Sequence, residues 1–117
     1  MNYRDALERM GGDEPFLEDL LDLYFKDFAT KYFRIQKAIE QENFKLMEEL
    51  GHGLKGASAV LSLGPLQKIS FDLEMAGRER YLEKAKEIPL LLAHELQRLK
   101  EFLEKRSGQA LEAQMGK

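Results

Sequence analysis

Apolar residues recur at helical spacing along almost the whole chain, and this periodicity constrains the fold more than any other feature of the sequence. In an α-helix, residues three, four and seven positions apart lie on the same face. The chain has few runs of β-branched residues bounded by turn residues, so no sheet is expected. The sequence therefore predicts an all-α fold.

Glycine and proline residues divide the periodic pattern into a short helix and four longer ones. The short helix is expected over residues 3–10, where the pair Gly11-Gly12 ends it. Asp13 then provides an N-cap, and Pro15 lies in the first turn of a helix that continues to about residue 41. Three further helices are expected over about residues 43–61, 65–77 and 82–106, with Asn43 as a candidate N-cap of the first of them.

Four amphipathic helices joined by short connections bury their apolar stripes most economically as an antiparallel four-helix bundle. The short first helix is expected to cover one end of that bundle. Residues 1–106 are expected to form this single domain, since 117 residues are enough for one sizeable core but few for two. Residues 107–117 show little apolar periodicity and are expected to form a frayed or disordered tail.

The composition argues against several classes of function. A net charge of −3 without a basic patch argues against nucleic-acid binding. No targeting segment and no membrane-spanning apolar stretch is present, so a cytoplasmic location is expected. The absence of cysteine excludes disulfides and thiolate metal sites. No metal site is expected at His52 or His94 either, because neither has a second histidine three or four residues away.

His52 is predicted to face the solvent. Its helix has one apolar stripe, and at 100° per residue the imidazole points almost directly away from the centre of that stripe. The stripe consists of Met47, Leu50, Leu54, Ala57 and Leu61. By itself, an outward histidine is compatible with a ligand, a nucleophile or a residue without a chemical role.

Two neighbours of His52 favour phosphoryl chemistry. Lys55 and Gly56 follow three and four residues later, where helical side chains are adjacent. An imidazole that is substantially neutral at physiological pH is a nucleophile, and Lys55 supplies a compact positive charge beside it. Gly56 lies on the same side as His52 and keeps the space over the ring open. An isolated surface lysine is ordinarily only solvated and has no chemical role. The position of Lys55 beside His52 makes that interpretation less favoured here.

The segment His52-Gly-Leu-Lys-Gly-Ala-Ser-Ala-Val-Leu resembles the signature of histidine-containing phosphotransfer (HPt) domains, which is roughly His-x-Leu-Lys-Gly-Ser-Ser-x-x-Leu-Gly. Downstream, Leu73-Glu-Met-Ala-Gly-Arg is similar to the Leu-Glu-x-x-Gly-Arg ending of the family's next helix. The resemblance covers about residues 3–106. Two positions differ: Ala57 replaces a frequent serine, and Ser62 replaces a frequent glycine whose role in the turn is expected to pass to Gly64.

The resemblance implies a phosphorelay intermediate of two-component signalling, which carries a phosphoryl group and has no kinase activity of its own. His52 would accept the group from the aspartyl phosphate of a receiver domain and pass it to another receiver aspartate. Lys55 would stabilise the phosphoryl charge and Gly56 would allow close approach. The implied partners are receiver domains of response regulators and a hybrid histidine kinase.

The same resemblance implies that no cofactor is bound to this chain, because the partner receiver supplies the magnesium ion. The docking surface is expected to include Ala59, Val60 and Leu63, with Phe25 and Phe33 as further candidates. The chain is expected to be a monomer.

Two other interpretations stay open. The chain has the features expected of the phosphotransfer domain of a chemotaxis-type histidine kinase, detached from its catalytic domains, which would change the phosphate donor but not the site. It is also compatible with a helical adaptor in which His52 has no chemical role. No glycine-rich nucleotide loop is present, so autophosphorylation from ATP is not expected.

Overall fold

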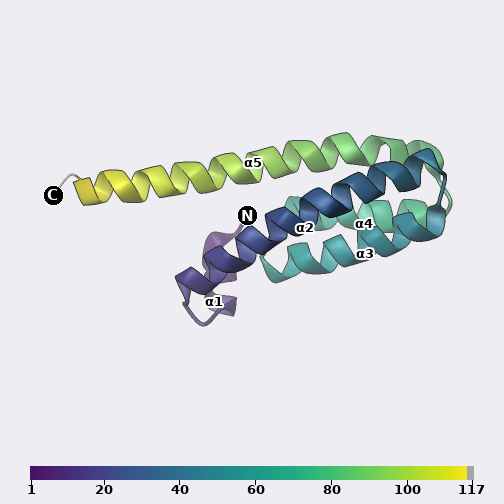
Figure 1. Cartoon of the computed structure of the whole chain (residues 1–117). Coiled ribbons are helices and arrows are strands. Elements are labelled where there is room, and N and C mark those ends of the chain that lie inside the picture. The colour runs from purple at the N-terminus through teal and green to yellow at the C-terminus, as the bar shows by residue number, and fades with distance from the viewer. Residues whose placement is uncertain (116–117) are drawn as a thin grey trace.

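A computed structural model describes the backbone of residues 1–115 and the side chains of residues 1–108 (Figure 1). This part of the chain contains helices and no strand, which confirms the all-α prediction. None of its helices is both long and apolar enough to cross a membrane. The helices are α1 (Tyr3–Arg9), α2 (Glu14–Glu40), α3 (Phe44–Val60), α4 (Gly64–Arg78) and α5 (Leu82–Met115).

The four long helices form a closed bundle. Helix α3 packs most extensively against α4, α4 packs against α5, and α2 contacts both α3 and α5. Short turns reverse the chain between consecutive helices, and α1 covers the end of the bundle where α2 begins (Figure 1). The predicted antiparallel four-helix bundle with a short additional N-terminal helix is therefore confirmed.

Side-chain caps begin two of the helices where the sequence predicts them. The Asp13 carboxylate accepts a hydrogen bond from the backbone N–H of Phe16 at 3.0 Å, and Pro15 lies in the first turn of α2. At the start of α3, the Asn43 side chain accepts from the N–H of Leu46 at 3.1 Å. Each cap satisfies a backbone donor that has no partner within its own helix.

The turn between α3 and α4 differs from the prediction. Gly64 does not take the role of the family's usual glycine, because it is already the first residue of α4. Ser62 itself adopts the left-handed conformation, with φ of 56°. Two contacts with the N-terminal segment hold it there: its hydroxyl donates to the Asp5 carboxylate, and its carbonyl accepts from the N–H of Asn2 at 3.1 Å.

Helix α5 is longer than predicted. Its end was expected at about Arg106, but the backbone is helical to Met115. The physical reason is that this segment consists mainly of good helix formers, and Gly108 is the only strong helix-disfavouring residue in it. Residues 116 and 117 lie outside the described residues, and the domain boundary at residue 106 stays a prediction.

The apolar stripe of α3 faces the core as predicted, and it includes a buried hydroxyl. Met47, Leu50, Leu54 and Leu61 are buried, and so is Ser58. The Ser58 hydroxyl donates to the carbonyl of Leu54 at 2.7 Å, which leaves its oxygen to accept from the Tyr24 hydroxyl 2.8 Å away. Burial raises the pKa of Tyr24 to about 12, so this phenol stays protonated and links α2 to α3.

Candidate functional site

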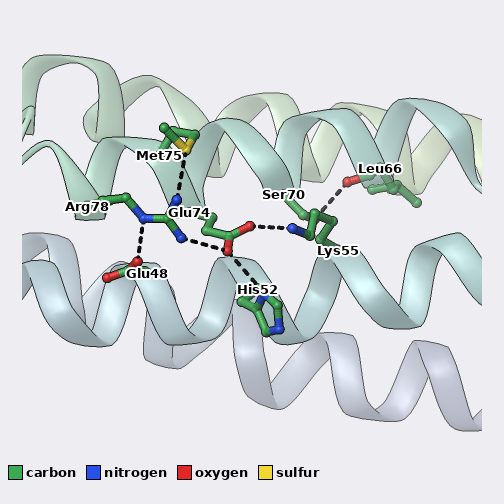
Figure 2. A network of polar contacts seen from close by, with 8 residues as sticks. All are labelled: Glu48, His52, Lys55, Leu66, Ser70, Glu74, Met75 and Arg78. Carbon is green, nitrogen blue, oxygen red and sulfur yellow. Dashed lines mark hydrogen bonds and ion pairs between the residues drawn. The ribbon is translucent and has the colours of Figure 1, made fainter.

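His52 lies in the middle of α3 with 71% of its side chain exposed, so the predicted orientation is confirmed. One ring nitrogen, Nδ1, lies 3.0 Å from Oε2 of Glu74 on the neighbouring helix α4. Figure 2 shows the other ring nitrogen turned away from that carboxylate. The imidazole is therefore held from one side and presented to the solvent on the other.

Glu74 is the centre of a polar cluster between α3 and α4 (Figure 2). Only 5% of its side chain is exposed, and three basic groups surround it. Besides the contact with His52, its Oε1 lies 2.7 Å from Nζ of Lys55, and its Oε2 lies 3.4 Å from a guanidinium nitrogen of Arg78. Arg78 also binds Glu48 of α3 at 2.8 Å. A buried carboxylate needs such partners, because an unpaired buried charge is strongly destabilising.

Two glycines allow α3 and α4 to approach closely enough for this cluster. A methyl group at Gly51 would lie 2.5 Å from the backbone nitrogen of Glu74 and 2.8 Å from the carbonyl oxygen of Ser70. A methyl group at Gly77 would lie 2.5 Å from the backbone nitrogen of Glu48. Gly51, the residue before His52, thus lies where the backbones of α3 and α4 are in contact. That contact brings Glu74 within reach of the imidazole.

The structure separates the roles of the other two glycines of α3. Apart from its chain neighbours and the backbone of its own helix, no described atom lies within 4 Å of the position that a Cβ of Gly56 would occupy, so the predicted open space at Gly56 is present. Gly53 contacts a side chain instead: its Cβ position lies 3.5 Å from Nζ of Lys31, on α2. Close helix packing therefore explains Gly51 but not Gly53 or Gly56.

Lys55 lies beside His52 as expected, but its ammonium is directed to Glu74. The group is mostly buried and is also 5.4 Å from the centre of the Phe71 ring. In this structure its ammonium therefore forms an ion pair with the buried Glu74 carboxylate and does not lie unpaired over the imidazole.

The residues predicted to contact a partner fall into two groups. Val60 is half exposed, and Ala59 is partly exposed near the end of α3. Leu63 is only 1% exposed and lies in the N-cap position of α4, beyond α3. Its assignment to the docking surface is wrong, because its side chain belongs to the core. Phe33 is exposed on α2, whereas Phe25 is half-buried against the core.

Glu74 is the member of this cluster that periodicity and spacing do not single out. In the sequence it is the second residue of the Leu73-Glu-Met-Ala-Gly-Arg motif. A signal for it was nevertheless present, because it follows Leu66, Ser70 and Leu73 on the side of α4 that is buried. A carboxylate on a buried helix face requires a cationic partner, and His52 and Lys55 lie on the helix before it.

No group of three or more histidine, aspartate or glutamate side chains among the described residues is arranged to hold a metal ion. His94 is exposed on α5, as predicted.

The cluster makes the stability of the fold depend on pH. The hydrogen bond from Lys55 lowers the pKa of Glu74 below its ordinary value of 4.5; burial opposes this shift and the contact with His52 adds to it. Because the unfolded chain then binds the proton more readily, the stability that Glu74 contributes is complete above pH 4.5. It is lost as the pH falls through the native pKa.

We therefore expect the free energy of unfolding of the wild type to fall more steeply below pH 4.5 than that of a Glu74→Gln variant. Urea unfolding at a series of pH values between about 3 and 6, the range around an ordinary glutamate pKa, measures the difference. A Glu87→Gln variant, which changes an exposed glutamate of α5, should follow the wild-type curve. Parallel curves for wild type and Glu74→Gln would contradict the expectation.

Comparisons with known proteins match the chain to one family. The Hpt domain family model matches residues 19–102. The relative "Multistep phosphorelay regulator 1" of Schizosaccharomyces pombe is 32% identical over 87 residues, which are 73% of this chain and 30% of that protein. The chain thus spans less than a third of the length of this relative. No solved structure matches the chain significantly.

Proposed function

This chain belongs to the Hpt domain family, and on that premise we propose that His52 accepts a phosphoryl group from the aspartyl phosphate of a receiver domain and passes it to another receiver aspartate. Family membership supports a phosphotransfer role in two-component signalling, as a carrier rather than a kinase. The observation that carries the proposal is an exposed imidazole with one nitrogen held by a buried carboxylate and the other turned outward.

The contact with Glu74 supports an assignment of the nitrogen that reacts. An ionised carboxylate only accepts hydrogen bonds, so the 3.0 Å contact places the proton of the neutral ring on Nδ1. The lone pair available for attack is then on Nε2. We propose Nε2 as the atom that is phosphorylated, with Glu74 as a positioning residue that fixes the ring and its tautomer.

In the transfer step, the Nε2 lone pair forms a bond to phosphorus while the bond between phosphorus and the aspartyl oxygen breaks. The electron pair of that bond leaves with the receiver carboxylate. The ring keeps its Nδ1 proton and becomes a cation, which the adjacent Glu74 carboxylate stabilises. In the second transfer, a receiver carboxylate attacks phosphorus and the electron pair of the N–P bond returns to Nε2.

The remaining parts of the site support this step. Gly56 leaves space for the receiver to approach in line with the N–P bond. Lys55 holds Glu74 in its ionised form and adds positive charge near the phosphoryl group. In the proposal, the aspartate and its magnesium ion belong to the partner receiver domain.

We propose that the receiver docks on the exposed face of α2 and α3 next to His52. An apolar groove of about 360 Å³ lies between α2 and the part of α3 that follows His52 in the sequence, and Leu20, Leu23, Ala57 and Val60 are among the residues that line it. Leu23 and Val60 are more than half exposed. Apolar surface of this kind at a site of macromolecular approach is typical of docking surfaces.

The proposal is tested by incubating the chain with a receiver domain whose aspartate carries ³²P. Label that moves to this chain and is acid-labile but base-stable supports the proposal, because those stabilities are typical of phosphohistidine. No label from any receiver tested would support a helical adaptor instead. Incubation with labelled ATP alone should leave the chain unlabelled, and label from ATP would contradict the carrier role.

A Glu74→Gln variant should accept the phosphoryl group about 10-fold to 100-fold more slowly than the wild type, by analogy with the effect of removing the hydrogen-bond partner that orients a metal-binding histidine. The variant keeps the shape of the side chain but loses its negative charge. Long-range ¹H–¹⁵N correlation spectra of the His52 ring supply a second measurement: the wild type should show the neutral ring protonated at Nδ1, and the variant should show a mixture of tautomers. Unchanged spectra and rates would contradict the role of Glu74.

A further inference from the structure

A second lysine reaches the helix that carries His52. Lys31 of α2 has its Nζ 3.5 Å from the Cβ position of Gly53, the residue directly after His52. The Lys31 side chain is only 21% exposed, so it lies along the surface between α2 and α3 and does not extend into solvent. A methyl group at position 53 would make only ordinary van der Waals contact with this ammonium, so the Lys31 side chain lies directly against α3 at this position.

The two lysines lie on opposite sides of the imidazole. Viewed down α3, Gly53 is rotated about 100° to one side of His52, and Lys55 about 60° to the other side. Lys55 occupies the side toward α4, where it binds Glu74. Lys31 occupies the side toward α2. A phosphoryl group on His52 would therefore lie between two ammonium groups from different helices.

The present ion pairs of the two lysines differ in how easily they can be broken. Lys55 neutralises a carboxylate that is 5% exposed, and its departure would leave a buried charge with less compensation. Lys31 pairs with Asp27 at 2.8 Å, but the Asp27 carboxylate is about half exposed and is readily hydrated. Exposed ion pairs within a helix are weak. Lys31 is therefore the cation that can move at lower cost.

We propose that Lys31 is a second phosphoryl-binding residue of the His52 site. On phosphorylation, its ammonium exchanges the Asp27 carboxylate for the phosphoryl oxygens, which carry more negative charge. Lysine suits this movement, because its charge is compact and its four-carbon stem is flexible. This role rests on the proposed phosphorylation of His52. It adds Lys31 of α2 to the site, and it makes Asp27 the competitor that binds Lys31 while His52 is not phosphorylated.

The test is the equilibrium of phosphoryl transfer between a ³²P-labelled receiver domain and this chain, measured as the ratio of label on the two separated proteins. This ratio depends on the stability of the two phosphorylated proteins and not on how tightly they dock. A Lys31→Met variant should shift the ratio about 10-fold away from this chain, and a Lys31→Arg variant should stay near the wild type. A Lys26→Met variant, which removes the same charge from an exposed position of α2, is the matched control and should also stay near the wild type.

Asp27 supplies a result of opposite sign. An Asp27→Asn variant releases Lys31 and should shift the ratio several-fold toward this chain. In a Lys31→Met background, the same Asp27→Asn change should have a much smaller effect, because Asp27 acts through Lys31.

The outcomes separate the inference from the function on which it rests. Transfer to the wild type with equal ratios for Lys31→Met and Lys26→Met overturns the role of Lys31 and leaves the role of His52 intact. An Asp27→Asn effect that is undiminished in the Lys31→Met background also overturns it. Absence of transfer to the folded wild type overturns the proposed function itself.

Discussion

Replacing His52 with glutamine should reduce phosphoryl acceptance from a receiver domain by at least about 10³-fold, the size of effect seen when a reacting nucleophile is removed. The amide nitrogen of glutamine has no available lone pair to attack phosphorus, so the substituted side chain cannot replace the imidazole as the nucleophile. The fold should be preserved because His52 is 71% exposed and contributes one side-chain hydrogen bond. The initial rate of ³²P transfer measures the effect, and urea unfolding should show a free energy within about 1 kcal/mol of the wild type.

His94 provides the matched control, since it is the only other histidine and is also exposed. A His94→Gln variant makes the same chemical change on α5 and should accept the phosphoryl group at the wild-type rate. Equal label on the His52→Gln variant and the wild type would show that another residue is the acceptor. Loss of label only in the His94→Gln variant would move the site to α5.

The parts of the site that lie on one helix could be predicted from the sequence. The rotation of 100° per residue relates His52, Lys55 and Gly56 to the apolar stripe of α3, and the structure keeps that relation. Local capping signals such as Asp13 and Asn43 were predicted for the same reason: each acts within four residues.

Contacts between helices could not be predicted in the same way. The pairing of Glu74 with His52 depends on the register of α4 against α3, which helical periodicity alone does not define. Leu63 was predicted to be exposed by continuing α3 past its end, whereas the chain turns at Ser62 and buries Leu63. Ser62 keeps its left-handed conformation through contacts with Asn2 and Asp5, residues far away in the sequence.

Replacing Gly51 with alanine should lower the free energy of unfolding by about 2 kcal/mol or more, although alanine is the better helix former by about 1 kcal/mol. The added methyl group would lie 2.5 Å from the backbone nitrogen of Glu74, 2.8 Å from the carbonyl oxygen of Ser70 and 2.9 Å from the Cα of Glu74. All three atoms belong to the backbone of α4, so no side chain can rotate away. The two helices must separate, and the cost of that separation exceeds the gain in helix propensity.

Gly56 is the control that isolates this cause, because it belongs to the same helix but no described atom beyond its neighbours and local helix backbone lies within 4 Å of its Cβ position. A Gly56→Ala variant should raise the free energy of unfolding by about 0.5–1 kcal/mol, since only the helix propensity changes. Urea unfolding of both variants therefore tests the close approach of α3 and α4 by the opposite signs of the two effects. If Gly51→Ala were stabilising as well, the helices would not be as close as the structure shows, and the contact between Glu74 and His52 would lose its structural basis.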